Sequence, residues 1–124
     1  MTASDTQQAL LKRLFSAIDA RDTETFAGVL AEDAVFRFGS GPQVEGRDAI
    51  AAAVEGFFAS IAALSHVLDK TLASGDTLVC EGEVTYTRHD GSDISLPFAN
   101  VFELDGPLIS HYKIYIDIAP LFAK

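Results

Sequence analysis

The stretch from Thr77 to Asp117 constrains the fold most, because it reads as three successive β-strands joined by short turns. From Thr77 to Arg88, apolar and polar side chains alternate, which is the period of a strand with one buried face. Asp90-Gly91 and Asp105-Gly106-Pro107 then interrupt the chain with residues typical of tight reversals. The sequence therefore predicts an antiparallel meander.

The turn at Asp90-Gly91 determines which side chains share a face. If these two residues form the whole turn, Glu83 lies opposite Phe98 and Glu81 lies opposite Asn100, so both acids point into the concave side of the sheet. Polarity alone favours the alternative, in which both acids belong to a solvated face. The opposite, buried face would then carry four apolar residues: Leu78, Cys80, Val84 and Tyr86.

The second turn leaves two registers open. A two-residue turn at Asp105-Gly106 would place His111 opposite Asn100, whereas a longer loop ending at Leu108 would place Tyr112 there. We prefer the longer loop because it keeps apolar side chains together on one face: Tyr112, Ile114 and Ile116.

The chain before the meander begins with two predicted helices. Ser4 and Gln7 form a capping-box pair, and apolar residues recur behind them at helical spacing. This pattern predicts a helix that ends near Arg21. Asp22 or Thr23 can cap a second, shorter helix.

A short strand, Ala34 to Phe38, is predicted before a third helix that begins near Arg47, and another strand before the meander, Ser65 to Ala73. Gly56 costs the third helix about 1 kcal/mol relative to alanine, so we expect close packing there. Helices grouped before an antiparallel sheet indicate the α+β class, with the third helix on the concave side of a curled sheet. We expect one domain, 1–124, shaped as an open-mouthed cone that can hold a ligand.

Composition and charge exclude several functions. The net charge of −9 repels phosphates and anionic lipids, so neither nucleic acid nor a membrane is an expected partner. Cys80 is the only cysteine and the three histidines are dispersed, so no disulfide, metal site or cofactor is predicted. The polar start, Met1 to Gln8, lacks a signal-peptide pattern, and a cytoplasmic location is expected.

Several separate motifs occur along nearly the whole chain in a definite order: Leu14 to Phe36, Val44 to Ile50, Phe98 to Gly106, and Lys113 to Leu121. Together they resemble the nuclear transport factor 2-like superfamily, in particular its SnoaL-like branch. The resemblance implies a cone-shaped, curved antiparallel sheet wrapped on the N-terminal helices. It also implies a homodimer through the convex face, where four residues offer apolar area: Val84, Tyr86, Val101 and Tyr115.

The family includes ketosteroid isomerases, polyketide cyclases, epoxide hydrolases and non-catalytic members, and their catalytic sets are mostly missing here. The position of the isomerase base falls at Phe38, although their second acid falls at Asn100, whose amide can still donate to an oxyanion. The epoxide hydrolase residues fall at Glu83, Thr85 and Ile114, none of which matches in kind. For the cyclase carboxylate and its nearby histidines, Asp117 and His66 are candidates.

Our catalytic hypothesis places Glu83 inside the cone as a general base, because a carboxylate against aromatic rings has a raised pKa. Asn100 and Tyr112 would donate hydrogen bonds to an enolate-like or phenolate-like oxygen. Twelve further residues are expected to line the pocket: Phe15, Phe36, Phe38, Phe57, Phe58, His66, Glu81, Thr85, Phe98, Phe102, Ile114 and Ile116.

Two kinds of function follow from this site. The first is binding of a small apolar ring compound, with cofactor-free proton transfer of the isomerase or cyclase type. The alternative is a non-catalytic protein that only binds a ligand, or an association module whose cone is filled by its own aromatic side chains.

Overall fold

The computed structural model describes residues 3–123, which form four helices and six strands. The predicted domain 1–124 and the Met1–Gln8 segment therefore extend slightly beyond the described residues. In chain order the elements are α1 (Asp5–Asp19), α2 (Thr23–Gly28), β1 (Leu30–Phe38), β2 (Gln43–Glu45), α3 (Arg47–Ala59), β3 (Ala63–Ser74), β4 (Thr77–Thr87), β5 (Asp93–Asp105), β6 (Leu108–Tyr115) and α4 (Ala119–Phe122). The predicted helices and strands are all present, whereas β2 and α4 lie outside the predicted elements.

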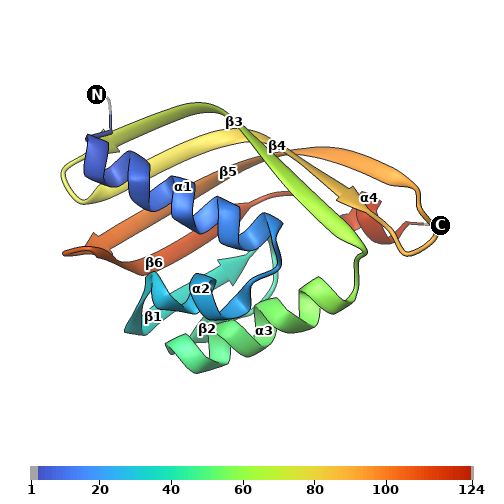
Figure 1. The fold of residues 1–124 in the computed structure, drawn as a ribbon, viewed down its shortest axis with the longest axis horizontal. Coiled ribbons are helices and arrows are strands. Elements are labelled where there is room, and N and C mark those ends of the chain that lie inside the picture. The colour runs from blue at the N-terminus through green and yellow to red at the C-terminus, as the bar shows by residue number, and fades with distance from the viewer. Residues whose placement is uncertain (1–2, 124) are drawn as a thin grey trace.

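The six strands form one curved sheet in the order β2-β1-β6-β5-β4-β3, with α1, α2 and α3 on its concave side (Figure 1). This arrangement confirms the α+β prediction. The meander is antiparallel, but β1 joins it parallel to β6, which pairs Phe36 with Tyr112. In Figure 1, α1 lies across the concave side, and α3 lies beside β1 and β2. None of the helices in residues 3–123 is long and apolar enough to cross a membrane.

The start of the fold follows the predicted capping chemistry. The Ser4 side chain accepts from the Gln7 backbone N–H, and the Gln7 side chain accepts from the Ser4 backbone N–H, so the capping box is complete. Asp22, one of the two predicted caps, begins α2 by accepting from the Thr25 N–H. Helix α1 ends at Asp19 without a basic residue in its last turn.

Two glycines have opposite roles in the fold. Gly82 on β4 lies under the β3 backbone, where a Cβ would overlap the Val67 carbonyl oxygen. The β3–β4 register shifts between Leu68 and Lys70, so a bulge and this close approach occur together where the sheet bends. Gly56, by contrast, has nothing within 4 Å of an added Cβ. The expected close packing at Gly56 is therefore wrong.

The turn between β4 and β5 is longer than the two residues assumed from Asp90-Gly91. The Arg88 N–H donates to the Ser92 carbonyl, and the Gly91 N–H donates back to the Arg88 carbonyl. The loop therefore holds three residues, and the register moves by one. Cys80 pairs with Asn100, and Glu83 pairs with Pro97.

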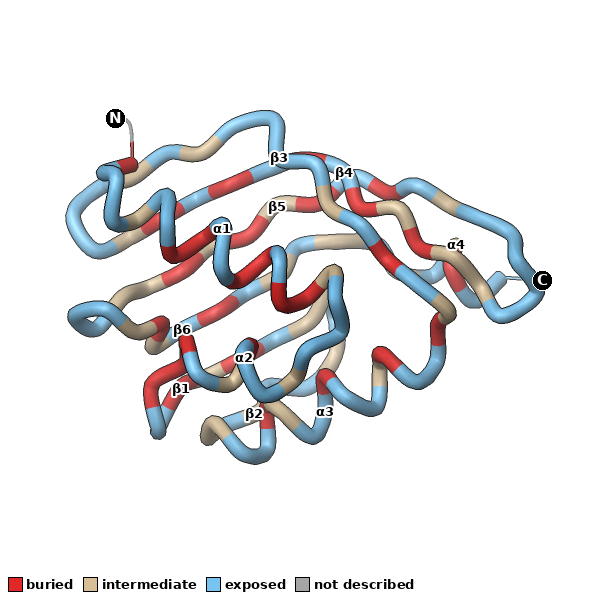
Figure 2. Tube along the Cα trace, viewed as in Figure 1, coloured by how far each residue is buried: buried red, intermediate tan, exposed pale blue. Residues whose placement is uncertain are grey.

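This shift reverses the predicted faces of β4, since a one-residue slip moves every side chain to the other side. The predicted pairing of Glu83 with Phe98 is wrong, because Gly82 lies opposite Phe98. The solvated-face alternative is confirmed. Buried and exposed residues alternate along β4, visible as alternating colours in Figure 2.

The β5–β6 hairpin also contains an irregularity. Asp105 pairs with Leu108, but a register shift between Glu103 and Leu104 brings Ile114 opposite Asn100. Neither His111 nor Tyr112 is therefore the partner of Asn100. The bulge preserves the predicted face, however, since Tyr112 is buried and His111 is exposed.

The reversal of β4 also changes which residues lie on the convex face of the sheet. Val84 and Tyr86, proposed above for a dimer interface, are only 1% and 3% exposed and lie in the concave core. They therefore cannot contact a partner across the convex face. Val101 is half-buried and Tyr115 is exposed.

Candidate functional site

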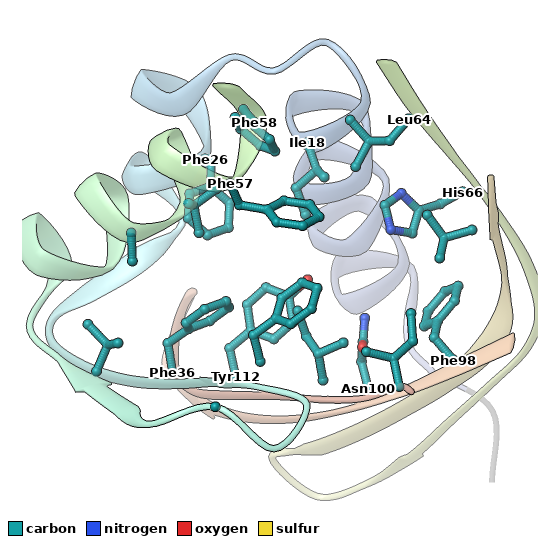
Figure 3. A pocket seen from close by; sticks show the side chains of 18 of the residues that line it. Ile18, Phe26, Phe36, Phe57, Phe58, Leu64, His66, Phe98, Asn100 and Tyr112 are labelled. Carbon is teal, nitrogen blue, oxygen red and sulfur yellow. The ribbon is translucent and has the colours of Figure 1, made fainter. Parts of the chain in front are cut away.

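The concave side of the sheet encloses a cavity of about 280 Å³ (Figure 3). Its inner walls are buried residues, such as Phe26, Asn100 and Tyr112. Its more exposed lining residues include Pro42 and Ala53, which come from the β1–β2 loop and α3. The mouth therefore lies between that loop and α3, and the deep end lies over β5 and β6.

The cavity brings together most of the predicted site residues. Those that line it are Phe36, Phe38, Phe57, Phe58, His66, Phe98, Asn100, Tyr112, Ile114 and Ile116. Residues on five different elements thus converge, because the curled sheet turns one face of each strand toward the helices.

Two predicted lining residues lie behind the wall instead. The Phe102 ring is fully buried, with its centroid 4.6 Å from that of Tyr112. The Phe15 ring packs against His66 at a centroid distance of 5.0 Å. Both residues pack behind side chains that line the cavity. Helical and strand periodicity therefore predicted the correct side of each element, but neither residue reaches the cavity itself.

The three polar residues expected on the inner face of β4 point outward. Glu81 and Glu83 are exposed, and the Thr85 hydroxyl hydrogen-bonds Ser95 at 2.8 Å in an exposed cross-strand pair. Glu83 is therefore not the base of this cavity. The cause is the three-residue turn, which the sequence Asp90-Gly91 does not distinguish from a two-residue one.

Other lining residues went unpredicted, although most carry a readable signal. Val84 and Tyr86 belong to the apolar half of the β4 alternation, and Ile18 and Val54 belong to apolar stripes of α1 and α3. Leu64 lies next to the predicted start of its strand. Gly41 and Pro42 of the β1–β2 loop and Val44 of the unpredicted strand β2 have no such pattern in the sequence.

The most polar part of the site is a histidine held by a carboxylate. His66 Nδ1 lies 2.6 Å from Asp19 Oδ1, and the His66 backbone N–H donates to Asp19 Oδ2 at 3.0 Å. The His66 and Asp19 side chains are 10% and 30% exposed. An ionised carboxylate can only accept, so Nδ1 carries the proton, and Nε2 of the neutral ring is left as a proton acceptor.

The position of Asp19 is locally unfavourable. A carboxylate at a helix C-terminus faces the negative end of the helix dipole, and the last turn of α1 holds no basic residue. His66 provides two hydrogen bonds that offset this repulsion. Sequence reasoning considered His66 alone, because the pairing joins residues far apart in the chain and Asp19 looks like an ordinary helix-end residue.

A buried amide lies on the same side of the cavity as His66, below it in Figure 3. Asn100 is 1% exposed, and its Oδ1 has no hydrogen-bond partner among the described residues. Burial raises the pKa of the neighbouring Cys80 thiol to about 12, although the polar groups of Asn100 act in the opposite direction. The thiol therefore stays protonated and unreactive near neutral pH.

Two tyrosines in the wall remain neutral as well. Desolvation raises the pKa of Tyr112 well above its usual value, and the nearby acidic groups, Cys80, Tyr86 and Asp19, raise it further. Desolvation also raises the pKa of Tyr86. Both hydroxyls therefore keep their protons at physiological pH and can serve as hydrogen-bond donors.

Aromatic rings dominate the half of the cavity nearer the mouth. The Phe38 and Phe57 rings lie 5.0 Å apart, and Phe57 meets Tyr86 edge-on at 5.6 Å. The described lining contains neither lysine nor arginine, and residues 3–123 contain no group of His, Cys, Asp and Glu side chains that could hold a metal ion. The arrangement therefore suits an uncharged, flat, largely apolar ligand.

The architecture matches solved structures over nearly its full length. An NTF2-like protein of unknown function from Burkholderia pseudomallei superposes with a TM-score of 0.86, at 19% identity over 96% of each chain. A candidate SnoaL-like polyketide cyclase from Jannaschia superposes with a TM-score of 0.84, at 18% identity over 98% of this chain and 94% of that one. TerC, co-crystallised with polyporic acid, gives 0.83 at 14% identity over 95% and 96%.

These likenesses define the class of protein, an NTF2-like cone, and at such identities they show the fold alone. The family follows from the sequence, since a family model described as a SnoaL-like domain matches residues 11–112. The chain therefore belongs to the SnoaL-like domain family, as predicted. Among curated proteins, no sequence matches this chain.

Proposed function

We propose that the protein binds a small, largely apolar ring compound in the cavity and transfers a proton on it, with His66 as the general base. The observation that carries this proposal is the His66–Asp19 pair, with the Nδ1 to Oδ1 distance of 2.6 Å, in the wall of an otherwise apolar cavity. Imidazole is the side chain most often used as a general base, because one ring nitrogen can accept a proton while the other is held by a hydrogen bond.

The chemistry follows from the orientation of the imidazole. Nε2 would accept a proton from an acidic C–H of the ligand, next to a carbonyl group, and the electron pair would move onto the carbonyl oxygen to give an enolate. Asp19 would stabilise the imidazolium that forms, because its carboxylate accepts the Nδ1 proton bond throughout. Return of the proton to another atom completes an isomerisation. Alternatively, the enolate carbon attacks a second carbonyl and closes a ring, and the alkoxide that forms takes the proton back from the His66 imidazolium.

Tyr112 would stabilise the developing negative charge on oxygen. Its hydroxyl is kept protonated by burial and therefore remains a donor. In a site from which water is largely excluded, a hydrogen bond aimed at a forming oxyanion is stronger than in water. In this scheme Tyr112 keeps the donor role expected from the sequence, while His66 replaces Glu83.

The ligand class is supported by the size and walls of the cavity. At the packing density of protein interiors, a cavity of about 280 Å³ accommodates roughly 210 Å³ of ligand atoms, which suits a compound of one or two rings. The phenylalanine rings of the cavity wall can stack on the flat faces of such a compound. The co-crystallisation of the structural neighbour TerC with polyporic acid supports a small organic ligand for this fold.

Exchange of ring-ketone C–H bonds with solvent tests the proposal directly. We expect the protein to accelerate deuterium incorporation into 2-tetralone, followed by NMR, because enolisation exchanges the protons next to the carbonyl. His66→Gln should lower the rate by about 10² to 10⁴-fold, the usual contribution of a general base. Asp19→Asn should lower it as well, since the imidazolium loses its partner.

His111→Gln is the matched control, because it removes an exposed histidine from the outer side of β6. It should leave the exchange rate unchanged. Equal rates for the His66→Gln variant and the parent protein would disprove the role of His66. Binding of 2-tetralone without any accelerated exchange would instead favour the alternative function, a ligand-binding protein without chemistry.

A further inference from the structure

The outer side of the sheet carries a second hollow, a groove of about 410 Å³ where the β1–β2 loop meets β6. On β1, Phe36 lines the cavity, whereas the next residue, Arg37, lines the groove, because successive side chains of a strand point to opposite faces. The same holds for Tyr112 and Lys113 on β6. Since α1, α2 and α3 cover the concave side, they leave this groove open to solvent (Figure 1).

Two cations lie next to each other in this groove. Arg37 and Lys113 are partners in the parallel β1–β6 ladder, and both are exposed. Like charges directly opposite each other destabilise a sheet, so an acidic partner would be expected to offset them. The chain has 18 acidic residues against nine lysines and arginines. Within residues 3–123, however, neither cation forms a salt bridge.

Three acidic residues on neighbouring positions of the sheet leave this pair of charges in place. Glu103 on β5 accepts hydrogen bonds from the Thr77 hydroxyl, and the Asp117 carboxylate accepts one from the Ala119 backbone N–H. Glu45 on β2 pairs with the strand one step away from the groove, whose described lining contains no acidic residue. The groove therefore keeps a local positive charge in a chain whose net charge is −9.

Further hydrogen-bond donors surround the two cations. The Arg37 Nε donates to the Gly41 carbonyl at 3.1 Å, which anchors the guanidinium at the groove and leaves its terminal NH₂ groups available. Ser40, Gln43 and Tyr115 also line the groove, and all three are exposed. A guanidinium, an ammonium, two hydroxyls and an amide thus border one hollow, and each of them can donate to an oxyanion.

We propose that this groove binds the phosphate group of a small organic phosphate ester. The planar guanidinium of Arg37 can bind two phosphate oxygens at once, and Lys113 adds a second point charge. Two positive charges match the dianion, whereas a carboxylate needs only one. The volume of about 410 Å³ exceeds what a bare phosphate fills, and Ile116 and the Tyr115 ring offer apolar area for the organic part.

The overall negative charge of the chain is compatible with this site. At physiological ionic strength, charges farther apart than about 8 to 10 Å are largely screened, so a single phosphate responds mainly to the groups that line the groove. A long polyanion would extend over the acidic remainder of the surface and be repelled. The site therefore suits a small ester and not a nucleic acid.

Titration of the full chain with phenyl phosphate, followed by two-dimensional NMR of the backbone amides, tests the proposal. The signals of Ser40 and Tyr115, which line the groove only, should shift in a saturable way. Those of Phe26 and Val54, which line the cavity only, should stay in place, because the described cavity lining has no cation to hold a dianion. Inorganic phosphate should bind the same groove more weakly than the ester.

The variants Arg37→Gln and Lys113→Gln should each raise the Kd for phenyl phosphate about tenfold or more, the usual effect of losing one charge-assisted hydrogen bond. Lys113→Arg should retain binding because it keeps the charge. Lys70→Gln is the matched control, since it removes an exposed lysine from β3, outside the groove, and should leave the Kd unchanged. Circular dichroism checks that each variant remains folded.

Four results would overturn the inference. The first is the absence of shifts at Ser40 and Tyr115 up to the solubility limit of phenyl phosphate, and the second is shifts confined to Phe26 and Val54, which would place the probe in the cavity. The third is an equal loss of binding in Lys70→Gln and Lys113→Gln, which would mean unspecific attraction between charges. The fourth is inorganic phosphate binding as tightly as phenyl phosphate, which would exclude recognition of an ester.

Discussion

The two faces of β4 differ sharply in burial and in polarity. Toward the cavity the strand presents Cys80, Val84 and Tyr86, all buried, together with a glycine under the β3 backbone. Toward the outside it presents Glu81 and Glu83, both exposed. Ionisable side chains on one strand thus experience opposite environments, depending only on whether their number is even or odd.

This difference shows where chemistry can be located in such a cone. The acids of β4 are exposed to solvent on the face of the sheet away from the cavity. The cavity instead receives its ionisable groups from the helix α1 and the outermost strand β3, through Asp19 and His66. The central strands supply the shape and neutral donors, and the elements at the rim supply the proton acceptor.

Filling the space that Gly82 leaves under β3 should have the largest effect on the stability of the fold. In Gly82→Ala the new methyl group would overlap the Val67 carbonyl oxygen, and backbone cannot move aside as a side chain can. We expect a loss of about 3 kcal/mol or more in the free energy of unfolding, which is the upper range for overpacking. Urea denaturation followed by circular dichroism measures it.

The control for this substitution is Gly56→Ala in α3. A Cβ at Gly56 meets nothing within 4 Å, so the variant should gain about 0.5 to 1 kcal/mol from the higher helix propensity of alanine. If Gly82→Ala were as stable as the parent protein, β3 would not approach β4 as closely as the bulge at Leu68 and Lys70 implies.

The sequence predicted the elements of the fold well, because each depends on local signals. The Ser4 capping box and the alternation in β4 are examples, and both are present. Contacts that depend on loop conformation were harder to predict from the sequence. Asp90-Gly91 fits both a two-residue turn and the three-residue loop observed. The difference of one residue in loop length determines whether Glu83 faces the cavity or the solvent.

The candidate site was predictable in its walls but less so in its chemistry. Aromatic residues at strand and helix spacing, such as Phe36 and Phe57, line the cavity as expected. The pairing of Asp19 with His66 is a tertiary contact between the end of a helix and a strand far along the chain, and no spacing rule encodes it.

The buried thiol of Cys80 on the inner face should make the stability of the protein depend on pH in the alkaline range. Burial raises the pKa of this thiol from its ordinary value of 9.0 to about 12, whereas the unfolded chain keeps the ordinary value. Between pH 9 and 12 the unfolded state therefore loses a proton that the folded state retains. The contribution of Cys80 to the free energy of unfolding is therefore fully present below pH 9. It is lost as the pH rises from 9 to 12, by about 1.4 kcal/mol per pH unit.

Cys80→Ala should therefore show a weaker dependence of the unfolding free energy on pH above 9 than the parent protein, whatever its stability at pH 7. The remaining slope would come from Tyr86 and Tyr112, whose pKa values are also raised. Identical slopes for the variant and the parent protein would mean that the thiol ionises as easily in the folded state as in the unfolded one.

Neutralising an acid on the outer face should have the smallest effect of all. Glu83 is exposed and pairs across the ladder with Pro97, so Glu83→Gln removes no buried charge and no hydrogen bond to the cavity. We expect the unfolding free energy to change by less than about 0.5 kcal/mol, with the exchange of 2-tetralone unaltered. Glu81→Gln is the matched partner on the same face. A large loss of exchange in Glu83→Gln alone would return Glu83 to the cavity and would require the two-residue turn. The comparison of the two faces therefore depends on this exposed residue as much as on the buried ones.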